Sequence, residues 1–338
     1  MIAFPNAGVA EAAREGYADA VRDVAALPPV RSLAGGHVCV AGFTGQVGAT
    51  LVRILTEANI RVTGIARGPR SAVPDGVDAV YADVSDLSGA LSLHGFTHVF
   101  YAVGITSDYR SRPDEVISSQ LVGLERFLER VDPDCRFVFV SSARVYGRHP
   151  VDTPLLEESA AIVAPMHLDN LYDSTKRLAE SLCLSHAERR GLHVTVIRAG
   201  NLYGLGAPQS RTSVSELVRE AAATQRVTLT GHPSSLRNYC SAVDSAQGML
   251  LAAANGAPGR PYNVGSDEHL TTQQLGQAIA ACFDERIEIV ARPAGAPSFQ
   301  HLSIERARTE LGYTPRLRLN DALPAVAAEL AGALRDHA

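Results

Sequence analysis

Apolar residues along this chain gather in short runs that alternate with amphipathic stretches. From His37 onward these runs predict strands at 37–41, 60–66, 77–81, 97–103, 135–141 and 192–197, with helical patterns between most of them. Strands that alternate with helices in this way predict a parallel sheet with helices on both faces. The expected fold class is therefore α/β, with a doubly wound parallel sheet.

Two flanking regions differ from this pattern. Residues 9–27 place Ala, Val and Leu at helical spacing until Pro28 and Pro29, which predicts a helix packed outside the main fold. After Gly200, loops rich in Gly, Pro and Ser separate shorter helices, a texture typical of a smaller binding domain. We expect a helical extension over 1–35, a main domain over 36–200 and a second domain over 201–338. Segments near 238–243 and 261–264 are expected to return to the main sheet.

Composition narrows the class of protein. A chain of 338 residues that is 46% hydrophobic can bury a sizeable core, and its net charge of −5 argues against nucleic acid and anionic membranes as partners. No apolar run reaches membrane-span length and residues 1–30 lack a signal-peptide pattern, so we expect a cytoplasmic protein. Five widely spaced cysteines predict free core thiols, with no disulfide framework and no metal.

Lysine is almost absent from this chain. Of its 31 Lys and Arg residues only Lys176 is a lysine, and it lies four residues after Tyr172. Where Arg supplies nearly every cation, the remaining Lys should do something that Arg cannot, such as fitting a compact ammonium beside a hydroxyl and a ribose. A helix predicted over about 171–190 puts both side chains on one face.

A glycine-rich turn follows the first predicted strand. It reads Gly42-Phe43-Thr44-Gly45-Gln46-Val47-Gly48 and opens a helical run. Such a turn lets the backbone approach a pyrophosphate, whose charge is stabilised by free amides and by the positive helix end. The strand-turn-helix context predicts a dinucleotide site. Its expected contacts come from Gly42, Thr44, Gly45, Gln46, Val47 and Gly48.

The end of the second strand bears on the choice of dinucleotide. A NAD site usually has an acidic residue there for the adenosine ribose, but this chain has Ala66, followed by Arg67 and Arg70. A missing carboxylate and an added guanidinium suit a 2′-phosphate, so we predict NADP(H) in preference to NAD(H). The alternative is that both arginines are solvated surface charge. Asp83 and Val84, after the third strand, are candidates to hold the adenine edge.

A third motif carries hydroxyls at the end of the fifth strand. It reads Ser141-Ser142-Ala143-Arg144-Val145-Tyr146-Gly147 and lies where parallel sheets bind ligands. With this motif, the glycine-rich turn and Tyr172-x-x-x-Lys176, the chain resembles the extended short-chain dehydrogenase/reductase family over roughly residues 36–335. The resemblance is to the NAD-dependent epimerase/dehydratase type, whose members mostly act on nucleotide-diphosphate sugars. It implies a Rossmann-type sheet with a smaller C-terminal α/β substrate domain.

The resemblance implies roles for three residues. Tyr172 would be the acid/base, Ser142 would hold the substrate oxygen, and Lys176 would bind the nicotinamide ribose and lower the tyrosine pKa. A cation 4–6 Å away can lower a tyrosine pKa from near 10 by about 1 to 3 units, which brings proton transfer towards neutral pH. The resemblance also implies a homodimer whose interface includes the helix of Tyr172.

Other segments of family-like sequence indicate a nucleotide-diphosphate sugar as substrate. Asn201 would contact the sugar diphosphate, and Arg237 and Arg292 lie where the family has phosphate-binding arginines. Two guanidinium groups that bind one diphosphate make physical sense, because bidentate charge-assisted hydrogen bonds are strong and directional. Arg144 is also assigned to the substrate site. Each arginine taken alone would be interpreted as surface charge.

Departures from the family pattern narrow the reaction. The chain has Ala143-Arg144 where sugar dehydratases usually have an Asp-Glu pair and where decarboxylases tend to keep the Glu, which argues against both activities. The run from Ser141 to Gly147 is most similar to UDP-sugar 4-epimerases. Tyr101-Ala102-Val103-Gly104 and Gln120 also depart from the pattern, which leaves the nicotinamide side of the pocket and the usual water-mediated proton relay open.

Several functions remain after these arguments. The leading one is a nucleotide-sugar epimerase, and the first alternative is an NADPH-dependent reductase of a nucleotide-4-keto-sugar. Both need hydride transfer at a ring carbon while Tyr172 exchanges the hydroxyl proton. Reduction or isomerisation of a non-sugar carbonyl compound is a third, and a non-catalytic dinucleotide-sensing protein on the same fold is a fourth.

Overall fold

The computed structural model describes residues 6–69, 73–86, 92–105, 109–163, 170–293 and 295–336. Its centre is a seven-stranded sheet in the order β10-β6-β5-β4-β1-β2-β3. Every neighbouring pair in it is parallel. The strands are β1 (Val38–Ala41), β2 (Val62–Ala66), β3 (Val77–Tyr81), β4 (His98–Tyr101), β5 (Arg136–Ser142), β6 (His193–Ala199) and β10 (Arg260–Val264). The predicted doubly wound α/β fold is therefore confirmed.

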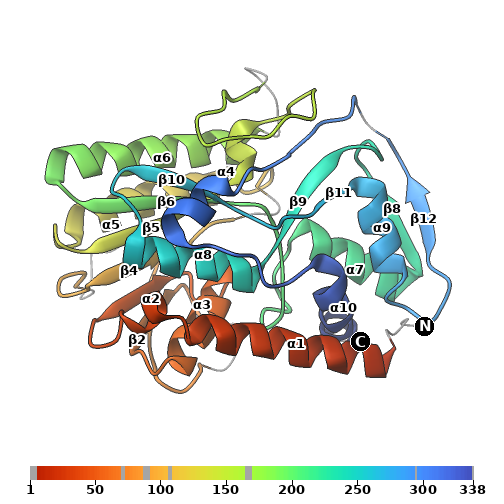
Figure 1. Ribbon diagram of the computed structural model, residues 1–338, viewed down its shortest axis with the longest axis horizontal. Coiled ribbons are helices and arrows are strands. Elements are labelled where there is room, and N and C mark those ends of the chain that lie inside the picture. The colour runs from red at the N-terminus through yellow and green to blue at the C-terminus, as the bar shows by residue number, and fades with distance from the viewer. Residues whose placement is uncertain are drawn as a thin grey trace.

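Helices cover both faces of this sheet (Figure 1). Alternate β1 residues point to opposite sides, so that Val38 and Val40 join one apolar cluster whereas Cys39 and Ala41 join another. The first cluster packs under α3 (Gln46–Glu57) and α8 (Ala242–Asn255), and the second packs under α5 (Gly123–Arg130) and α6 (Asn170–Arg190). Burial on both faces explains why these strands read as continuous apolar runs. All five cysteines are buried with free thiols.

The remaining helical elements are short or lie outside these two layers. They are α2 (Pro28–Arg31), α4 (Pro113–Ile117), α7 (Ser213–Thr224), α9 (Thr272–Ala280), α10 (Leu319–Asp336), the π-helical turns η1 (Ser118–Val122) and η3 (Ala307–Leu311), and the 3₁₀ turn η2 (Ala143–Tyr146). Among the described residues, none of these helices is both long and apolar enough to cross a bilayer.

Two small sheets lie beyond the main one. The first has the order β11-β9-β7 and joins β7 (Asn201–Tyr203), β9 (Leu236–Ser241) and β11 (His269–Thr271). The second pairs β8 (Arg226–Leu229) with β12 (Glu288–Ala291). The segment near 261–264 does return to the main sheet as β10, whereas the segment near 238–243 does not, because it forms β9 in the first small sheet. The domain limits themselves stay a prediction.

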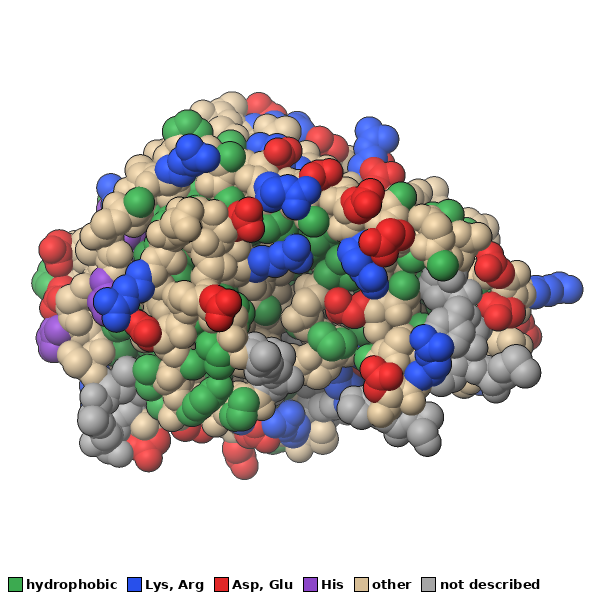
Figure 2. Space-filling view, turned by 90° about the horizontal axis from the view of Figure 1, so that it is seen from below, with side chains coloured by type: hydrophobic (Ala, Val, Ile, Leu, Met, Phe, Trp, Pro, Cys, Tyr) green, Lys and Arg blue, Asp and Glu red, His purple; other side chains and the backbone are tan. Residues whose placement is uncertain are grey.

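The N-terminal helix packs on the outer side of the helices that cover the sheet, and one of its faces is buried in the core. Helix α1 (Ala7–Ala25) begins at Asn6, whose side chain accepts from the Gly8 and Val9 amides, and it runs beside α10 along the lower side of the molecule (Figure 1). Tyr17, Val21 and Val24 are buried in the same cluster as α3, α8 and α10. On the face seen from below, acidic and basic side chains are interspersed with hydrophobic ones (Figure 2).

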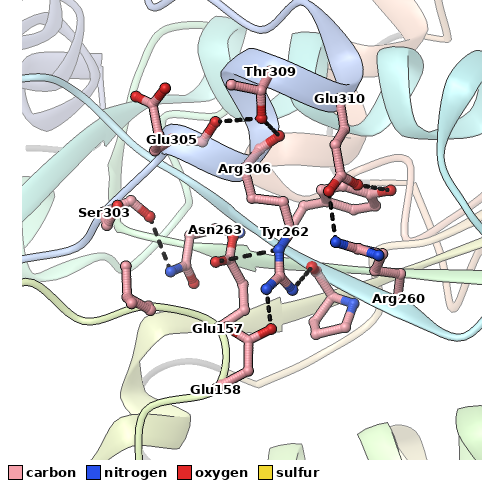
Figure 3. Close-up of polar contacts among 12 residues, drawn as sticks. Glu157, Glu158, Arg260, Tyr262, Asn263, Ser303, Glu305, Arg306, Thr309 and Glu310 are labelled. Carbon is pink, nitrogen blue, oxygen red and sulfur yellow. Dashed lines mark hydrogen bonds and ion pairs between the residues drawn. The ribbon is translucent and has the colours of Figure 1, made fainter.

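A polar network fastens the loop after β5 to the sheet edge (Figure 3). The Asn263 side chain of β10 donates to the Leu155 and Ser303 carbonyls, at 3.0 Å each, and accepts from the Tyr146 hydroxyl at 2.7 Å. The Asn263 amide donates to Glu157 at 2.8 Å, and burial raises the pKa of that carboxyl. Arg306 contacts both Glu157 and Glu158. The network therefore joins three segments that are far apart in sequence.

Asp244, in the first turn of α8, links this helix to the segment before α10. Its carboxylate accepts from Ser241 Oγ at 2.7 Å and from the Arg316 and Leu317 amides at 2.7 and 3.3 Å. Burial raises the pKa of Asp244 to about 6, although these hydrogen bonds oppose the shift. The native state therefore binds a proton more tightly than the unfolded chain does.

The protonation of Asp244 should appear in the pH dependence of stability. Because its folded pKa lies above the unfolded value, its contribution is full below about pH 4 and is lost as the pH rises through about 6. We expect the free energy of unfolding of the parent, relative to Asp244→Asn, to fall on the order of 2 to 3 kcal/mol between pH 4 and pH 7. Urea unfolding at several pH values measures this difference, and a difference that stays constant would contradict the assignment.

Candidate active site

The glycine-rich turn follows the carboxyl end of β1, and Ser142 and Arg144 lie at the carboxyl end of β5. The strand order reverses between β1 and β4, and at such a switch point an open parallel sheet leaves a crevice for ligands. A Cβ on Gly42, after β1, would lie 2.8 Å from the Ala102 carbonyl oxygen, and a Cβ on Gly104 would lie 3.5 Å from Lys176 Nζ. The short segment after β4 therefore contacts the glycine-rich turn at one end and the lysine at the other.

The glycine-rich turn is compact because its glycines have no side chains. Gly42 has φ +85°, a left-handed conformation, and a Cβ on Gly48 would lie 2.1 Å from the Gly42 carbonyl oxygen. Gly45 is the N-cap of α3, and no side chain of a described residue caps this helix. The first amides of α3 are thus available to an anion, and the missing Cβ atoms let it approach. The turn fits the pyrophosphate of a dinucleotide.

The second half of the chain holds this turn in place. Gln209 donates to the Thr44 carbonyl at 3.2 Å, and the buried Gln46 side chain donates to the Leu205 carbonyl at the same distance. Val47 is also buried. Of the predicted dinucleotide contacts, Gln46 therefore already has a structural partner in the loop after β7.

Arg67, beyond the end of β2, takes part in an ion pair. Its Nη1 lies 2.7 Å from Glu115 Oε2, and Arg112 binds the same carboxylate. Hydrogen bonds from Arg112 and then Arg67 lower the pKa of Glu115 to about 2. Strand β2 ends at Ala66, so there is no acidic residue at its end, as the sequence predicts. Arg70 lies outside the described residues.

The two other residues of the predicted adenine edge differ in exposure. Asp83 is exposed and accepts from the Ser85 amide at 2.8 Å and from Ser85 Oγ at 2.6 Å, so its carboxylate closes a local turn. Val84 is buried in the cluster under α5. Of the two, only Asp83 has a side chain that solvent reaches.

Tyr172 and Lys176 lie side by side on α6, and both are buried. The lysine Nζ is 5.9 Å from the Tyr172 ring centroid and 4.9 Å from that of Phe139, and it donates to the Val140 carbonyl at 2.8 Å. Burial lowers the pKa of Lys176 to about 8. Burial also raises the pKa of Tyr172, against the opposing effects of the Arg144 cation and a hydrogen bond with Ser142. Of the described groups that lower this tyrosine pKa, Arg144 has the largest effect.

Arg144 packs directly against the tyrosine. Its Cζ is 5.3 Å from the Tyr172 ring centroid and 5.5 Å from that of Tyr109, and its Nε lies 2.6 Å from Asp173 Oδ1. Its backbone amide donates to Ser142 Oγ at 3.2 Å. No motif in the sequence singles out Tyr109 or Asp173. For Asp173 a signal existed, since it directly follows Tyr172, but only the fold shows that it faces Arg144.

Gln120 lies behind the lysine. It is fully buried in the π-helical turn η1, and its Nε2 donates to the Ile105 carbonyl at 3.4 Å. Its Oε1 has no hydrogen-bond partner among the described residues. A Cβ on Gly104 would touch both Gln120 Cδ and Lys176 Nζ, so the carboxamide and the ammonium border the same small space.

The predicted substrate residues fall into two groups. Arg237 donates to the Leu236 and Ser298 carbonyls and to Ser298 Oγ, and burial lowers its pKa, with smaller contributions from Arg148 and Arg144. Asn201 donates to the Asn238 carbonyl at 3.1 Å and to Gln300 at 2.9 Å. Arg292 is exposed just beyond β12, and its described contact is a backbone bond to Leu229. The charge of Arg144 thus acts on Arg237, and no described interaction joins Arg237 to Arg292.

The fold and the motifs agree with a comparison against protein families. A model of the NAD dependent epimerase/dehydratase family matches residues 38–265, about two thirds of the chain. The chain belongs to this family. The resemblance that the sequence motifs carried is therefore confirmed at the level of the family.

Curated relatives of this family member carry out different reactions. UDP-glucuronic acid decarboxylase 6 of Arabidopsis thaliana is 25% identical, and the match covers 64% of each chain, slightly less than two thirds of that protein. UDP-glucose 4-epimerase of Corynebacterium glutamicum is 28% identical over 82% of this chain and 90% of its own. A dTDP-6-deoxy-L-talose 4-dehydrogenase (NAD(P)(+)) of Kitasatospora kifunensis is 26% identical over 86% and 94%.

Solved structures share the fold of the family member. The epimerase Mth375 of Methanothermobacter thermautotrophicus superposes with a TM-score of 0.79 at 20% identity, over 91% of this chain and 95% of that one. MoeE5, solved with UDP-glucose and NAD, gives a TM-score of 0.74 at 22% identity over 88% and 100%. At this identity the likeness concerns the fold.

The packing of the glycine-rich turn can be tested by adding one methyl group. In Gly48→Ala the new Cβ would collide with backbone atoms of Gly42 and Phe43, so the turn must shift, and we expect a loss of about 1 to 3 kcal/mol in the free energy of unfolding. Gly16→Ala is the control, since its site in α1 is open, and should add about 0.5 to 1 kcal/mol. Urea unfolding measures both, and a Gly48→Ala protein as stable as the parent would contradict the description.

Proposed function

We propose that this protein is a nucleotide-diphosphate-sugar epimerase that acts by reversible hydride transfer at a ring carbon. The supporting observation is the buried Tyr172 of α6 next to the half-buried Ser142 at the carboxyl end of β5, beside Lys176 and with Arg144 in place of a carboxylate. Elimination or decarboxylation of the family kind would need an acidic group there. Reversible oxidation of a hydroxyl needs only one group that exchanges its proton.

Proton exchange falls to Tyr172 in this proposal. The phenolate form takes the proton of the substrate hydroxyl and returns it when the carbonyl is reduced from the other face. Ser142 Oγ accepts the Arg144 amide, which leaves its own hydroxyl proton to donate to the substrate oxygen. Lys176, with a pKa of about 8, keeps its charge at pH 7.

A nicotinamide dinucleotide would supply the hydride acceptor and donor when bound. The Gly42–Gly48 turn and the uncapped start of α3 would hold its pyrophosphate, and Lys176 would lie by the nicotinamide ribose. We further propose that NADP(H) binds better than NAD(H). Ala66 provides no carboxylate for the ribose, and the exposed ion pair of Arg67 with Glu115 is weak enough for a 2′-phosphate to replace it.

The substrate side of the proposal rests on Arg237. This guanidinium is held by carbonyls and a hydroxyl, with no carboxylate partner among the described residues. Burial of a cation without a counter-ion is costly, so an anion such as a diphosphate would be favoured at this position. Asn201 and Arg144 complete the proposed substrate contacts, and Arg292 would have to approach from the end of β12. A homodimer stays a prediction; Leu178 and Leu184 of α6 are exposed.

A ketoreductase acting on a nucleotide-4-keto-sugar is the second candidate. Two observations favour it: the absence of an acidic residue at Ala66, which suits NADPH, and the similarity to the talose 4-dehydrogenase. An epimerase keeps its dinucleotide through the cycle, whereas a reductase consumes one NADPH for each product molecule. The two candidates therefore differ in cofactor balance.

Turnover of nucleotide sugars tests the main proposal. We expect conversion of a nucleotide sugar deuterated at the oxidised carbon into an epimer that keeps the deuterium, with no net change in dinucleotide redox state. Tyr172→Phe should lower kcat by about 10² to 10⁴-fold and still bind the dinucleotide, because only the exchangeable proton is lost. Product chromatography with mass spectrometry measures both. Stoichiometric consumption of NADPH with a 4-keto sugar would contradict the epimerase proposal and support the reductase.

Dinucleotide affinity tests the assignment of Arg67. If it binds the 2′-phosphate, Arg67→Ala should raise the Kd for NADP(H) by about 10 to 100-fold, and the Kd for NAD(H) should change less than about twofold. Arg61→Ala is a matched control, since Arg61 precedes the same strand at its opposite end and pairs with Asp78. Fluorescence titration of NADPH and NADH gives the constants. Equal changes for both dinucleotides would mean that Arg67 is surface charge.

A further inference from the structure

Neighbouring side chains surround the Arg144 guanidinium on several sides. Tyr172 and Tyr109 lie against it at 5.3 and 5.5 Å between Cζ and the ring centroids, and the two rings are 5.9 Å apart. Asp173 binds its Nε at 2.6 Å, and the Tyr109 hydroxyl lies 3.4 Å from its Nη2. The guanidinium is therefore fixed in place beside the ring of Tyr172.

The arrangement depends on properties that are specific to arginine. A guanidinium is planar and can pack on two aromatic rings while one edge still donates to a carboxylate. Asp173 has only 11% of its side chain exposed, so it holds its partner in a partly desolvated setting where charges interact more strongly than in water. A lysine ammonium could supply the charge, but it could not pack on two aromatic rings and at the same time present a planar edge to the carboxylate.

Other charged groups around Tyr172 are less well placed to do this. Lys176 is on the same helix, but its Nζ bonds the Val140 carbonyl and lies nearer to the ring of Phe139. Asp173 acts in the opposite sense and Ser142 is neutral. The titratable and charged groups that face this cluster are Arg144 from η2, Tyr109 from the segment before α4, Asp173, Lys176 and Arg177 from α6, Arg148 from the loop after η2 and Arg237 from β9.

We propose that Arg144, held by Asp173, is a positioning residue that supplies the positive charge beside Tyr172 and so favours the ionised form of this tyrosine. The inference rests on the proposed function in that ionised Tyr172 is the base of the reaction. A carboxylate at position 144 would act on the substrate itself, whereas the arginine, in addition to the substrate contact proposed above, acts through Tyr172. The pKa of Tyr172 is accordingly lowered by Arg144 more than by any other described group.

Absorbance titration of the tyrosines tests this without any substrate. The chain has ten Tyr and no Trp, so tyrosinate absorbance is not overlaid by indole, and the difference between a protein and the same protein with Tyr172→Phe isolates one residue. We expect Arg144→Gln to move the Tyr172 transition up by about 1 to 2 pH units, and Arg144→Lys to move it clearly less. Circular dichroism of the same samples restricts the comparison to folded protein.

Control variants and contrary outcomes make this test decisive. Arg177→Gln removes another α6 arginine, one that bonds Ser174 and acts on Asp173, and should move the Tyr172 transition clearly less than Arg144→Gln does. Arg144→Met, which keeps an apolar stem, replaces Arg144→Gln if that variant does not fold. An unchanged transition in Arg144→Gln, or equal shifts in Arg144→Gln and Arg144→Lys, would overturn the proposal.

Activity gives a second, separate readout. If the epimerase proposal holds, the acid limb of the kcat/KM profile should move up by the same number of pH units in Arg144→Gln and partly return in Arg144→Lys. A protein that converts no nucleotide sugar would contradict the proposed function, whereas the absorbance titration would still decide the role of Arg144. The two failures are therefore distinguishable.

Discussion

Burial of the Lys176 ammonium between α6 and β5 is the constraint on which the candidate site depends. A buried cation must find oxygen partners, and here one is the Val140 carbonyl near the end of β5. That bond fixes the height of α6 against the strand and hence the place of Tyr172 beside Ser142. Because the carboxyl ends of parallel strands meet at one edge, the same arrangement brings the tyrosine close to the glycine-rich turn after β1.

Polar groups behind the site keep this edge rigid. Glu180 of α6 accepts from Ser141 Oγ at 2.5 Å and from Arg198 of β6, and Arg198 donates in turn to the Tyr146 hydroxyl at 2.9 Å. Tyr146 then reaches Asn263 of β10. Each of these buried groups has a partner, so the network specifies one arrangement of α6, β5, β6 and β10. The side chains that face the crevice rest on this support.

Charge is distributed unevenly around the crevice. On the proposed dinucleotide side, Glu115 neutralises part of the charge of Arg67 and Arg112 at the surface, where salt and water weaken such pairs. On the proposed substrate side, Arg144 and Arg237 are partly buried, and only Arg144 has a described carboxylate partner. The site is thus prepared for anionic groups at both ends, with the tyrosine between them.

Sequence alone determined the order of strands and helices, the glycine-rich turn and the Tyr172-Lys176 pair, because each depends on residues that are neighbours in the chain. Apolar runs form strands wherever both faces are buried, and a spacing of four puts two side chains on one helical face. Only the tertiary structure decided which groups face them. Such contacts are those of Arg144 with Asp173 and Tyr109, of Arg67 with Glu115, and of one face of α1 with α3, α8 and α10. They join segments 29 to more than 300 residues apart. No local pattern encodes such contacts, since they depend on how helices and loops pack across the sheet.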